Sequence, residues 1–151
     1  MRAVVQRVRG SSVNIKGSEH SSIGRGLLIL LGVKQEDNEH GAAYLAEKCA
    51  PLRIFDDAAG KMNLSVRDVG GEVLIVSQFT LYGDAHRGNR PSFGQAARPE
   101  LAESLYDRFV LEMKKLLGSQ KVQSGVFREM MDVSLVNDGP VTLIVESKEL
   151  P

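Results

Sequence analysis

Residues 26–33 constrain the fold of this chain more than any other segment. The segment is continuously apolar, with glycine beside its large apolar side chains. A strand with one face in water alternates apolar and polar residues, whereas a strand covered on both faces can be apolar throughout. We therefore expect a β-strand here, with other parts of the chain packed on each of its two sides.

Shorter segments predict further strands around this one. Residues 2–9 and 12–16 are expected as two strands broken at Gly10, because apolar and polar residues alternate in the second of them. Apolar runs predict the other strands at residues 52–55, 73–76, 121–126, 131–136 and 141–146. The last two strands are expected to be joined by a compact turn at residues 137–140.

Two segments have the periodicity of helices. The first is expected to run from Asp37 or Asn38, either of which can cap a helix, to about Cys49. The second covers residues 99–117, where apolar side chains recur at steps of three or four. Strands dominate, and their order with the helices is not a regular βαβα alternation. The sequence thus predicts an α+β fold with largely antiparallel sheets, one medium helix and one long helix.

Length and composition narrow the class of protein. The 151 residues are expected to form one domain, residues 1–151. The only cysteine, Cys49, excludes an intramolecular disulfide, and the charged N-terminal stretch does not suit a signal peptide, so a cytoplasmic protein without a membrane partner is expected. The 19 basic and 19 acidic residues give no net charge. This balance argues against a protein that coats nucleic acid, but it leaves room for a local basic patch.

Metal and nucleotide chemistry have little support in the sequence. His20, His40 and His86 stand singly, and none of them forms a ligand spacing with Cys49. The glycine motifs that cradle phosphates or dinucleotides are missing as well. No metal and no cofactor are therefore expected.

Polar side chains follow the apolar strand at residues 73–76. If that strand continues, Ser77 and Phe79 face one way, while Gln78 and Thr80 face the other. Polar groups at a buried strand end bond to neighbouring backbone, which is the commoner case, or to a ligand. Ser77 or Thr80 has the chemistry of a nucleophile, although no histidine or lysine close in the sequence is an obvious base.

Two further segments have both an ordinary and a functional interpretation. Residues 137–142 suit a tight turn, and Pro140, which has no N–H to donate, belongs at a sheet edge or bulge. In the loop of residues 87–93, Arg87, Arg90 and Phe93 either form a solvated basic loop or contact phosphates and stack on a base.

In combination, four segments resemble the D-aminoacyl-tRNA deacylase family, in its order and at its spacing: residues 1–8, 77–81, 88–93 and 137–142. The resemblance implies an α+β fold with a barrel-like core. It also implies hydrolysis of the ester bond of D-aminoacyl-tRNA, and of glycyl esters on non-cognate tRNA, to free amino acid and tRNA. One departure lies at His86-Arg87, where the family leads us to expect lysine-rich sequence. The departure concerns contacts to RNA rather than the chemistry.

The same resemblance implies a homodimer that binds the 3′ end of an aminoacyl-tRNA, with active sites at the subunit interface. The residues implied to line one side of each site are Ser77, Gln78, Phe79 and Thr80. Gly139 and Pro140 of the other subunit are implied to close the site, with their peptide bond cis, and Arg7 to help hold them. Rejection of an L side chain by the Gly-Pro segment would then give chiral proofreading.

Mechanism and substrate leave alternatives open at this stage. Backbone N–H groups near Phe79 and Thr80 are candidates for stabilising the oxyanion, with the vicinal ribose hydroxyl placing the water. The alternative makes Thr80 a covalent nucleophile. Two rival functions are an enzyme of this fold that edits achiral or L-residues, and a non-catalytic RNA-binding module.

Overall fold

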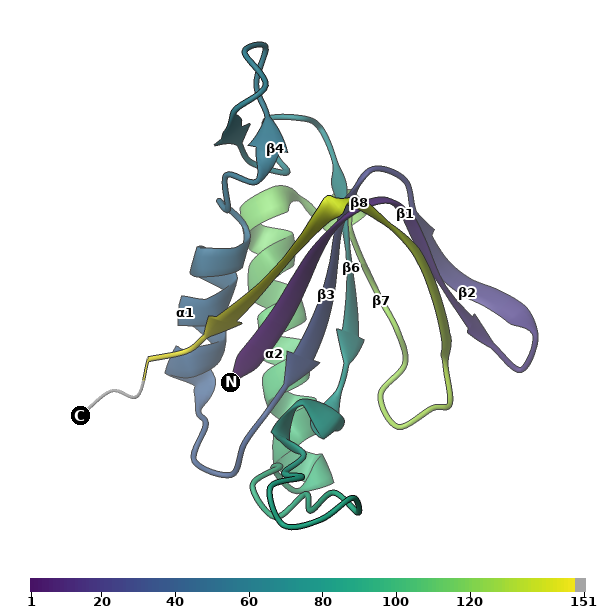
Figure 1. The fold of residues 1–151 in the computed structure, drawn as a ribbon, viewed down its shortest axis with the longest axis vertical. Coiled ribbons are helices and arrows are strands. Elements are labelled where there is room, and N and C mark those ends of the chain that lie inside the picture. The colour runs from purple at the N-terminus through teal and green to yellow at the C-terminus, as the bar shows by residue number, and fades with distance from the viewer. Residues whose placement is uncertain (149–151) are drawn as a thin grey trace.

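In the computed structural model, which describes residues 1–148, a curled sheet carries two helices on one of its faces (Figure 1). The sheet strands are β1 (Arg2–Ile15), β2 (Ser18–Ile23), β3 (Gly26–Gly32), β6 (Glu72–Ser77), β7 (Val122–Ser124) and β8 (Asp132–Glu146). A separate hairpin consists of β4 (Phe55–Asp56) and β5 (Met62–Leu64). The helices are α1 (Glu39–Cys49) and α2 (Pro99–Leu117), with short 3-10 turns η1 (Phe79–Tyr82) and η2 (Ser119–Lys121).

The sheet is mixed, and β1 organises it. Along one edge of β1, β3 pairs with its first half and β2 with its second half, while β8 pairs along the other edge, all antiparallel. The β3–β6 and β6–β7 pairs are parallel, because the chain crosses over through α1 and then α2 before each return. The prediction of an α+β fold with largely antiparallel pairing is confirmed, and the sheet forms a nearly closed barrel.

The core has one layer on each side of β3. Leu27, Ile29 and Leu31 belong to the cluster that β3 shares with both helices, and all three are buried. Leu28 belongs to a second cluster inside the curl of the sheet, together with Val8 and Leu74. The prediction of a strand covered on both faces is thus confirmed.

Both helices begin and end where the sequence indicates. Asn38 caps α1, and its side-chain oxygen accepts a hydrogen bond from the Gly41 N–H at 3.0 Å. Pro99 occupies the first turn of α2, where its missing N–H costs nothing, and Gly118 follows the last turn with φ 97°.

The predicted break at Gly10 and the predicted turn at residues 137–140 are both wrong. β1 and β8 each run unbroken past these positions, since each is the other's partner along its length. The pairing passes from Val8↔Asn137 to Gln6↔Thr142, so Arg7 alone faces the four residues 138–141. Residue types that suit a tight turn also suit such a bulge, which explains the error. We call residues 138–141 the Gly-Pro bulge.

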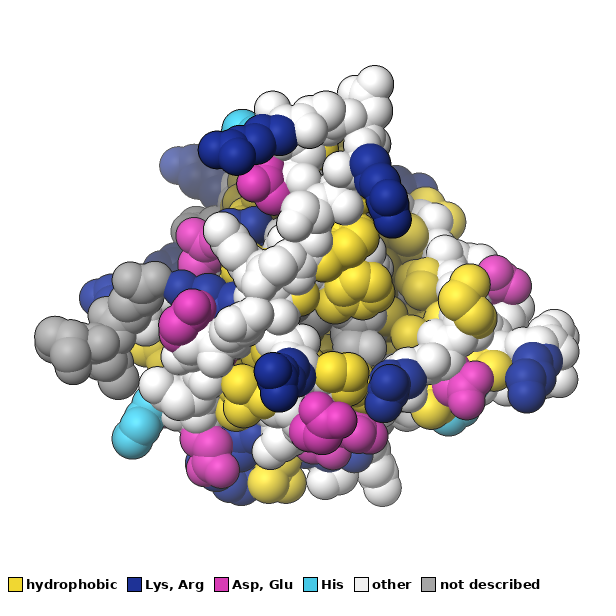
Figure 2. All heavy atoms as spheres, turned by 90° about the horizontal axis from the view of Figure 1, so that it is seen from below, with side chains coloured by type: hydrophobic (Ala, Val, Ile, Leu, Met, Phe, Trp, Pro, Cys, Tyr) yellow, Lys and Arg dark blue, Asp and Glu magenta, His cyan; other side chains and the backbone are white. Residues whose placement is uncertain are grey.

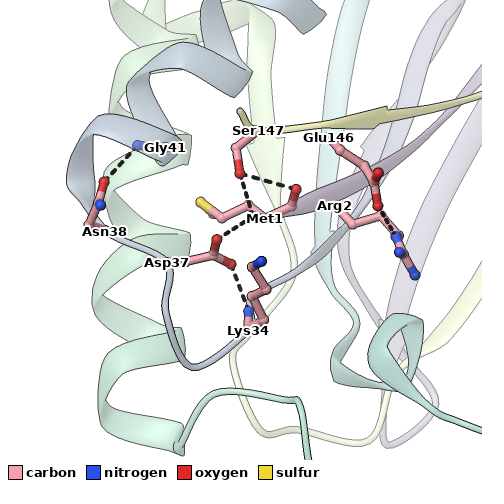
Figure 3. Close-up of polar contacts among 8 residues, drawn as sticks. All are labelled: Met1, Arg2, Lys34, Asp37, Asn38, Gly41, Glu146 and Ser147. Atoms are coloured by element: carbon pink, nitrogen blue, oxygen red, sulfur yellow. Dashed lines mark hydrogen bonds and ion pairs between the residues drawn. The ribbon is translucent and has the colours of Figure 1, made fainter. Parts of the chain in front are cut away.

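A buried ion pair joins the chain's two terminal strands to the loop before α1 (Figure 3). The α-ammonium of Met1 donates to Asp37 Oδ1 and to Ser147 Oγ, each at 2.5 Å. Asp37 Oδ2 in turn accepts the backbone N–H of Lys34 at 2.7 Å. The Met1 side chain is buried in the helix-facing core, and the Asp37 side chain is only 5% exposed. This cluster fixes the ends of β1 and β8 against the helical layer.

Candidate active site

A pocket of about 560 Å³ opens at the ends of β3 and β6. Ser77, Gln78 and Phe79 line one side of it, and Tyr106 of α2 lines another. The loop of residues 127–131 lies across from them. Figure 2 shows hydrophobic side chains gathered at the hollowed centre of this end of the molecule, with Lys and Arg side chains around the margin.

The polar segment after β6 forms a 3-10 turn, so the strand does not continue and the alternation that its continuation would give does not occur. The last ladder position pairs Leu31 with Ser77, and β3 ends one residue later at Gly32. With no partner strand left, the Gln78 N–H donates back to the Leu31 carbonyl at 2.8 Å and the chain turns into η1. Phe79 and Thr80 therefore do not alternate across a sheet.

Within this segment, three of the four predicted residues line the pocket and one does not. Ser77 and Gln78 are half-buried, and Phe79 is 56% exposed at the mouth. Thr80 is exposed and lies outside the lining, where its hydroxyl accepts a hydrogen bond from Gln78 Nε2. In the part of the chain that the structure describes, neither Ser77 nor Thr80 hydrogen-bonds to a histidine or a carboxylate.

Tyr106 is a pocket residue that the sequence did not single out. Its hydroxyl donates to the Ile75 carbonyl of β6 at 2.9 Å, and burial raises the pKa of Tyr106 to about 12. The hydroxyl thus stays protonated at neutral pH and braces α2 against the sheet rather than exchanging protons. In the sequence, the only signal that Tyr106 faces the sheet is that it directly follows Leu105, one of the apolar residues whose spacing predicted the helix.

The loop of residues 127–131 was also missed. Phe127 packs against Tyr106 with ring centres 6.1 Å apart, which holds the loop over the pocket. Arg128 adopts φ 67°, a conformation that residues other than glycine seldom adopt. No pattern in the sequence predicts this, because the loop is irregular and takes its shape from α2 and the sheet.

The predicted basic loop lies beside the pocket. Asp84 and Ser92 pair their backbones across it, with N–H to carbonyl distances of 2.7 and 2.8 Å. Phe93 meets Phe79 edge to face, with ring centres 5.0 Å apart. Arg87 and Arg90 are exposed on the same loop, so the structure brings their charges and the Phe79 side of the pocket into one region.

Gly139 and Pro140 do not line the pocket of their own chain. Both are exposed in the Gly-Pro bulge, and the peptide bond between them is cis. The bulge faces Arg7, whereas η1 contacts β1 near Arg2, through the Leu81 carbonyl. Five residues of strand separate these points, or about 17 Å. One chain therefore does not bring the two predicted halves of the site together.

Arg7 joins the bulge to the β4 region. Its Nε donates to the Asp138 carbonyl at 3.1 Å, and its Nη1 donates to the Ile54 carbonyl at 2.8 Å. The guanidinium also pairs with the carboxylates of Asp138 and Asp56 at 3.4 and 3.5 Å, although the Arg7 side chain is only 9% exposed. A planar guanidinium can satisfy several oxygens at fixed angles, so Arg7 sets where the bulge stands.

Residues 1–148 contain neither a helix that could span a membrane nor a cluster of metal-binding side chains. No helix there is long and apolar enough to cross a membrane. No three side chains of His, Cys, Asp or Glu in the same residues are grouped as a metal site requires.

Known proteins resemble this chain over nearly its whole length. A sequence model of the family described as D-Tyr-tRNA(Tyr) deacylase matches residues 4–146. The chain is 60% identical, over 98% of its length, to the whole of a D-aminoacyl-tRNA deacylase of Desulfatibacillum aliphaticivorans. It is 55% identical to one of Chlorobaculum tepidum over all of both chains. The solved structure of the c-Myc DNA Unwinding Element Binding Protein superposes with a TM-score of 0.93 at 41% identity, covering 99% of this chain and all of that one.

Proposed function

Because this chain belongs to the D-Tyr-tRNA(Tyr) deacylase family, we propose that it hydrolyses the ester bond between a D-amino acid and the 3′ end of a tRNA. The observation that carries the proposal is the pocket lined by Ser77, Gln78 and Phe79, which lies inside the matched range. Its volume of about 560 Å³ suits an aminoacyl group with part of the terminal nucleoside. Aminoacyl-tRNA is made in the cytoplasm, which would be the site of action.

A second copy of the chain completes the site in this proposal. β8 is an edge strand within the described sheet, and it exposes apolar side chains such as Val136 and Ile144, at 57% and 68%. An unprotected edge of this kind is a ready surface for pairing with another chain. In a two-fold dimer, Gly139 and Pro140 of each subunit would close the pocket of the other.

Chiral selection follows from the backbone of the Gly-Pro bulge. Its carbonyls would accept the α-ammonium of the substrate, which fixes the amino group, the ester and the α-hydrogen together. An L side chain would then collide with the bulge, whereas a D side chain would point out of the pocket. The choice would not depend on which side chain the D-residue carries, and glycyl esters would also be hydrolysed.

Hydrolysis needs a donor for the oxyanion and a placed water. The N–H groups of Phe79 and Thr80 are the first of η1, where a helix leaves its donors without acceptors of its own. They are our candidates for the oxyanion site. The vicinal hydroxyl of the terminal ribose would place the water, so that the tRNA supplies part of the catalyst.

The direct test is the deacylation of matched D-Tyr-tRNA and L-Tyr-tRNA by the purified protein. We expect rapid loss of the D-ester, with the L-ester decaying at the rate of a no-enzyme control. Gly-tRNA should be hydrolysed as well, because glycine has no side chain to exclude. Cleavage of both tyrosyl esters would refute the proposed chiral selection. Cleavage of neither would refute the proposed deacylase activity.

Replacing Thr80 with alanine separates the two mechanisms. If Thr80 only accepts the bond from Gln78, its loss removes one neutral hydrogen bond worth about 1 kcal/mol, so activity should fall less than about tenfold. Rates and mass spectra of the quenched reaction would measure this. A near-total loss in a folded variant, together with an acyl adduct on Thr80 of the parent, would instead establish a covalent nucleophile.

A non-catalytic nucleic-acid module is the second candidate. It is favoured by the similarity to a protein named for binding a DNA element, and by Arg87 and Arg90 beside the pocket. Multiple-turnover release of a D-amino acid would exclude binding as the sole function.

A further inference from the structure

The position of η1 is set by direct contact with the end of the sheet. A Cβ atom added to Gly32 would lie 3.0 Å from Leu81 Cβ and 3.2 Å from the Gln78 carbonyl oxygen. These separations are tighter than ordinary van der Waals contact, so η1 rests on bare backbone at the end of β3. Phe79 and Thr80 belong to the same short turn as Leu81, so a displacement of η1 at this contact would move them as well.

Arg2 holds η1 from the neighbouring strand. It lies beside Gly32 in the β1–β3 ladder, and its Nη1 donates to the Leu81 carbonyl at 2.8 Å. Its guanidinium carbon stands 5.0 Å from the ring centre of Tyr82, which is buried. Arg2 thus contacts the last two residues of η1, Leu81 through its backbone carbonyl and Tyr82 through its ring.

Glu146 orients Arg2 for this contact. The Arg2 Nε donates to Glu146 Oε1 at 2.7 Å, across the β1–β8 pair (Figure 3). The two side chains are 35% and 54% exposed, so the ion pair itself adds little to stability. The Arg2–Glu146 pair therefore contributes little to folding, but it fixes the direction in which the Arg2 guanidinium meets η1.

We propose that Arg2 is a positioning residue for the reaction proposed above, on which this inference rests. Arg2 fixes η1 so that the N–H groups of Phe79 and Thr80 point into the site. A displacement of about 1 Å in such a group lowers rates by about a hundredfold. Loss of Arg2 therefore acts on the chemical step more than on substrate binding or on folding.

The experiment compares Arg2→Ala with the parent protein on D-Tyr-tRNA. We expect kcat to fall by about tenfold to a hundredfold with KM nearly unchanged and the melting temperature within a few degrees. Added ethylguanidinium, which can enter this partly exposed position, should restore part of the rate. Arg2→Lys should be intermediate, because a single ammonium cannot contact Leu81, Tyr82 and Glu146 with the geometry of a guanidinium.

Hydrogen exchange tests the same inference without any activity. In Arg2→Ala, the amides of Leu81 and Gly83, which bond to Gln78 and Thr80, should exchange faster, while β3 amides stay protected. Unchanged exchange in η1, or a kcat within about twofold of the parent, would overturn the inference. If these amides exchange faster in Arg2→Ala but the parent protein hydrolyses neither ester, the role of Arg2 in fixing η1 is supported and only the proposed function is refuted.

Discussion

Replacing Arg7 with alanine is expected to lower the rate of D-aminoacyl-tRNA deacylation by about a hundredfold or more. Arg7 is the buried side chain that reaches the Gly-Pro bulge, and it bonds to the Asp138 carbonyl directly before Gly139. Without it, the bulge loses its fixed distance from Ile54 and the β4 region. Arg7→Lys should also be impaired, because an ammonium cannot reproduce the fork of hydrogen bonds.

Arg9 offers a matched control for this prediction. It lies two residues along β1 and pairs with the same carboxylate of Asp138, at 3.5 Å, but its side chain is 75% exposed. We expect Arg9→Ala to keep the deacylation rate within about twofold, as for other exposed ion pairs. Equal losses in both variants would mean that charge near Asp138 matters and that the buried position does not.

Mixed dimers test whether the bulge acts across subunits. Arg7→Ala damages the bulge of its own chain, and Arg2→Ala damages η1 of its own chain. If each site combines η1 of one subunit with the bulge of the other, a mixed dimer has one site with both parts intact. After subunits exchange at random, the mixture should regain about a quarter of the parent activity. Two inactive variants that stay inactive on mixing would place both elements in one chain's site.

Replacing Asp37 with alanine is expected to lower the free energy of unfolding by about 3 kcal/mol. The change removes acceptors for the Met1 α-ammonium and for the Lys34 N–H, worth about 1 kcal/mol each. Without the carboxylate, the buried Met1 ammonium can lose its proton, and deprotonation at pH 7 costs about 1.4 kcal/mol for a group with an ordinary pKa of 8.0. Thermal unfolding should show a melting temperature about 10 °C lower.

Glu39→Ala is the matched control for Asp37→Ala. Glu39 pairs with Arg108 at 3.1 Å, but its side chain is 69% exposed, so its loss should change stability by less than about 1 kcal/mol. A similar loss of stability in the two variants would show that the buried pair of Asp37 contributes no more than the exposed pair of Glu39.

The pH dependence of stability adds a second readout for Asp37. Burial lowers the pKa of the Met1 α-amino group below its usual 8.0, and the hydrogen bond with Asp37 opposes this change. The unfolded chain therefore holds the proton more tightly, and stability rises with pH between the lowered pKa and 8.0. Without Asp37 the pKa falls further, so denaturant melts should show a larger rise over a wider window in the variant than in the parent.

Local patterns were enough to predict the elements that carry their own signals. The continuous apolar run predicted β3 because burial on both faces leaves no alternation. Asn38 and the apolar period of α2 predicted both helices, since caps and periodicity act within a few residues. The resemblance of four short segments then indicated the family that the match over residues 4–146 shows.

The sequence by itself determined the helices, the buried strand and the residues after β6 as candidates for chemistry. Only the tertiary structure decided that the segment through Gly139 and Pro140 continues a strand, because that depends on β1 lying beside it for its full length. It also decided that η1 turns away after Ser77, because β3 offers no further partner. Turn residues and bulge residues are the same types, so their geometry is settled by long-range pairing, which no local pattern records.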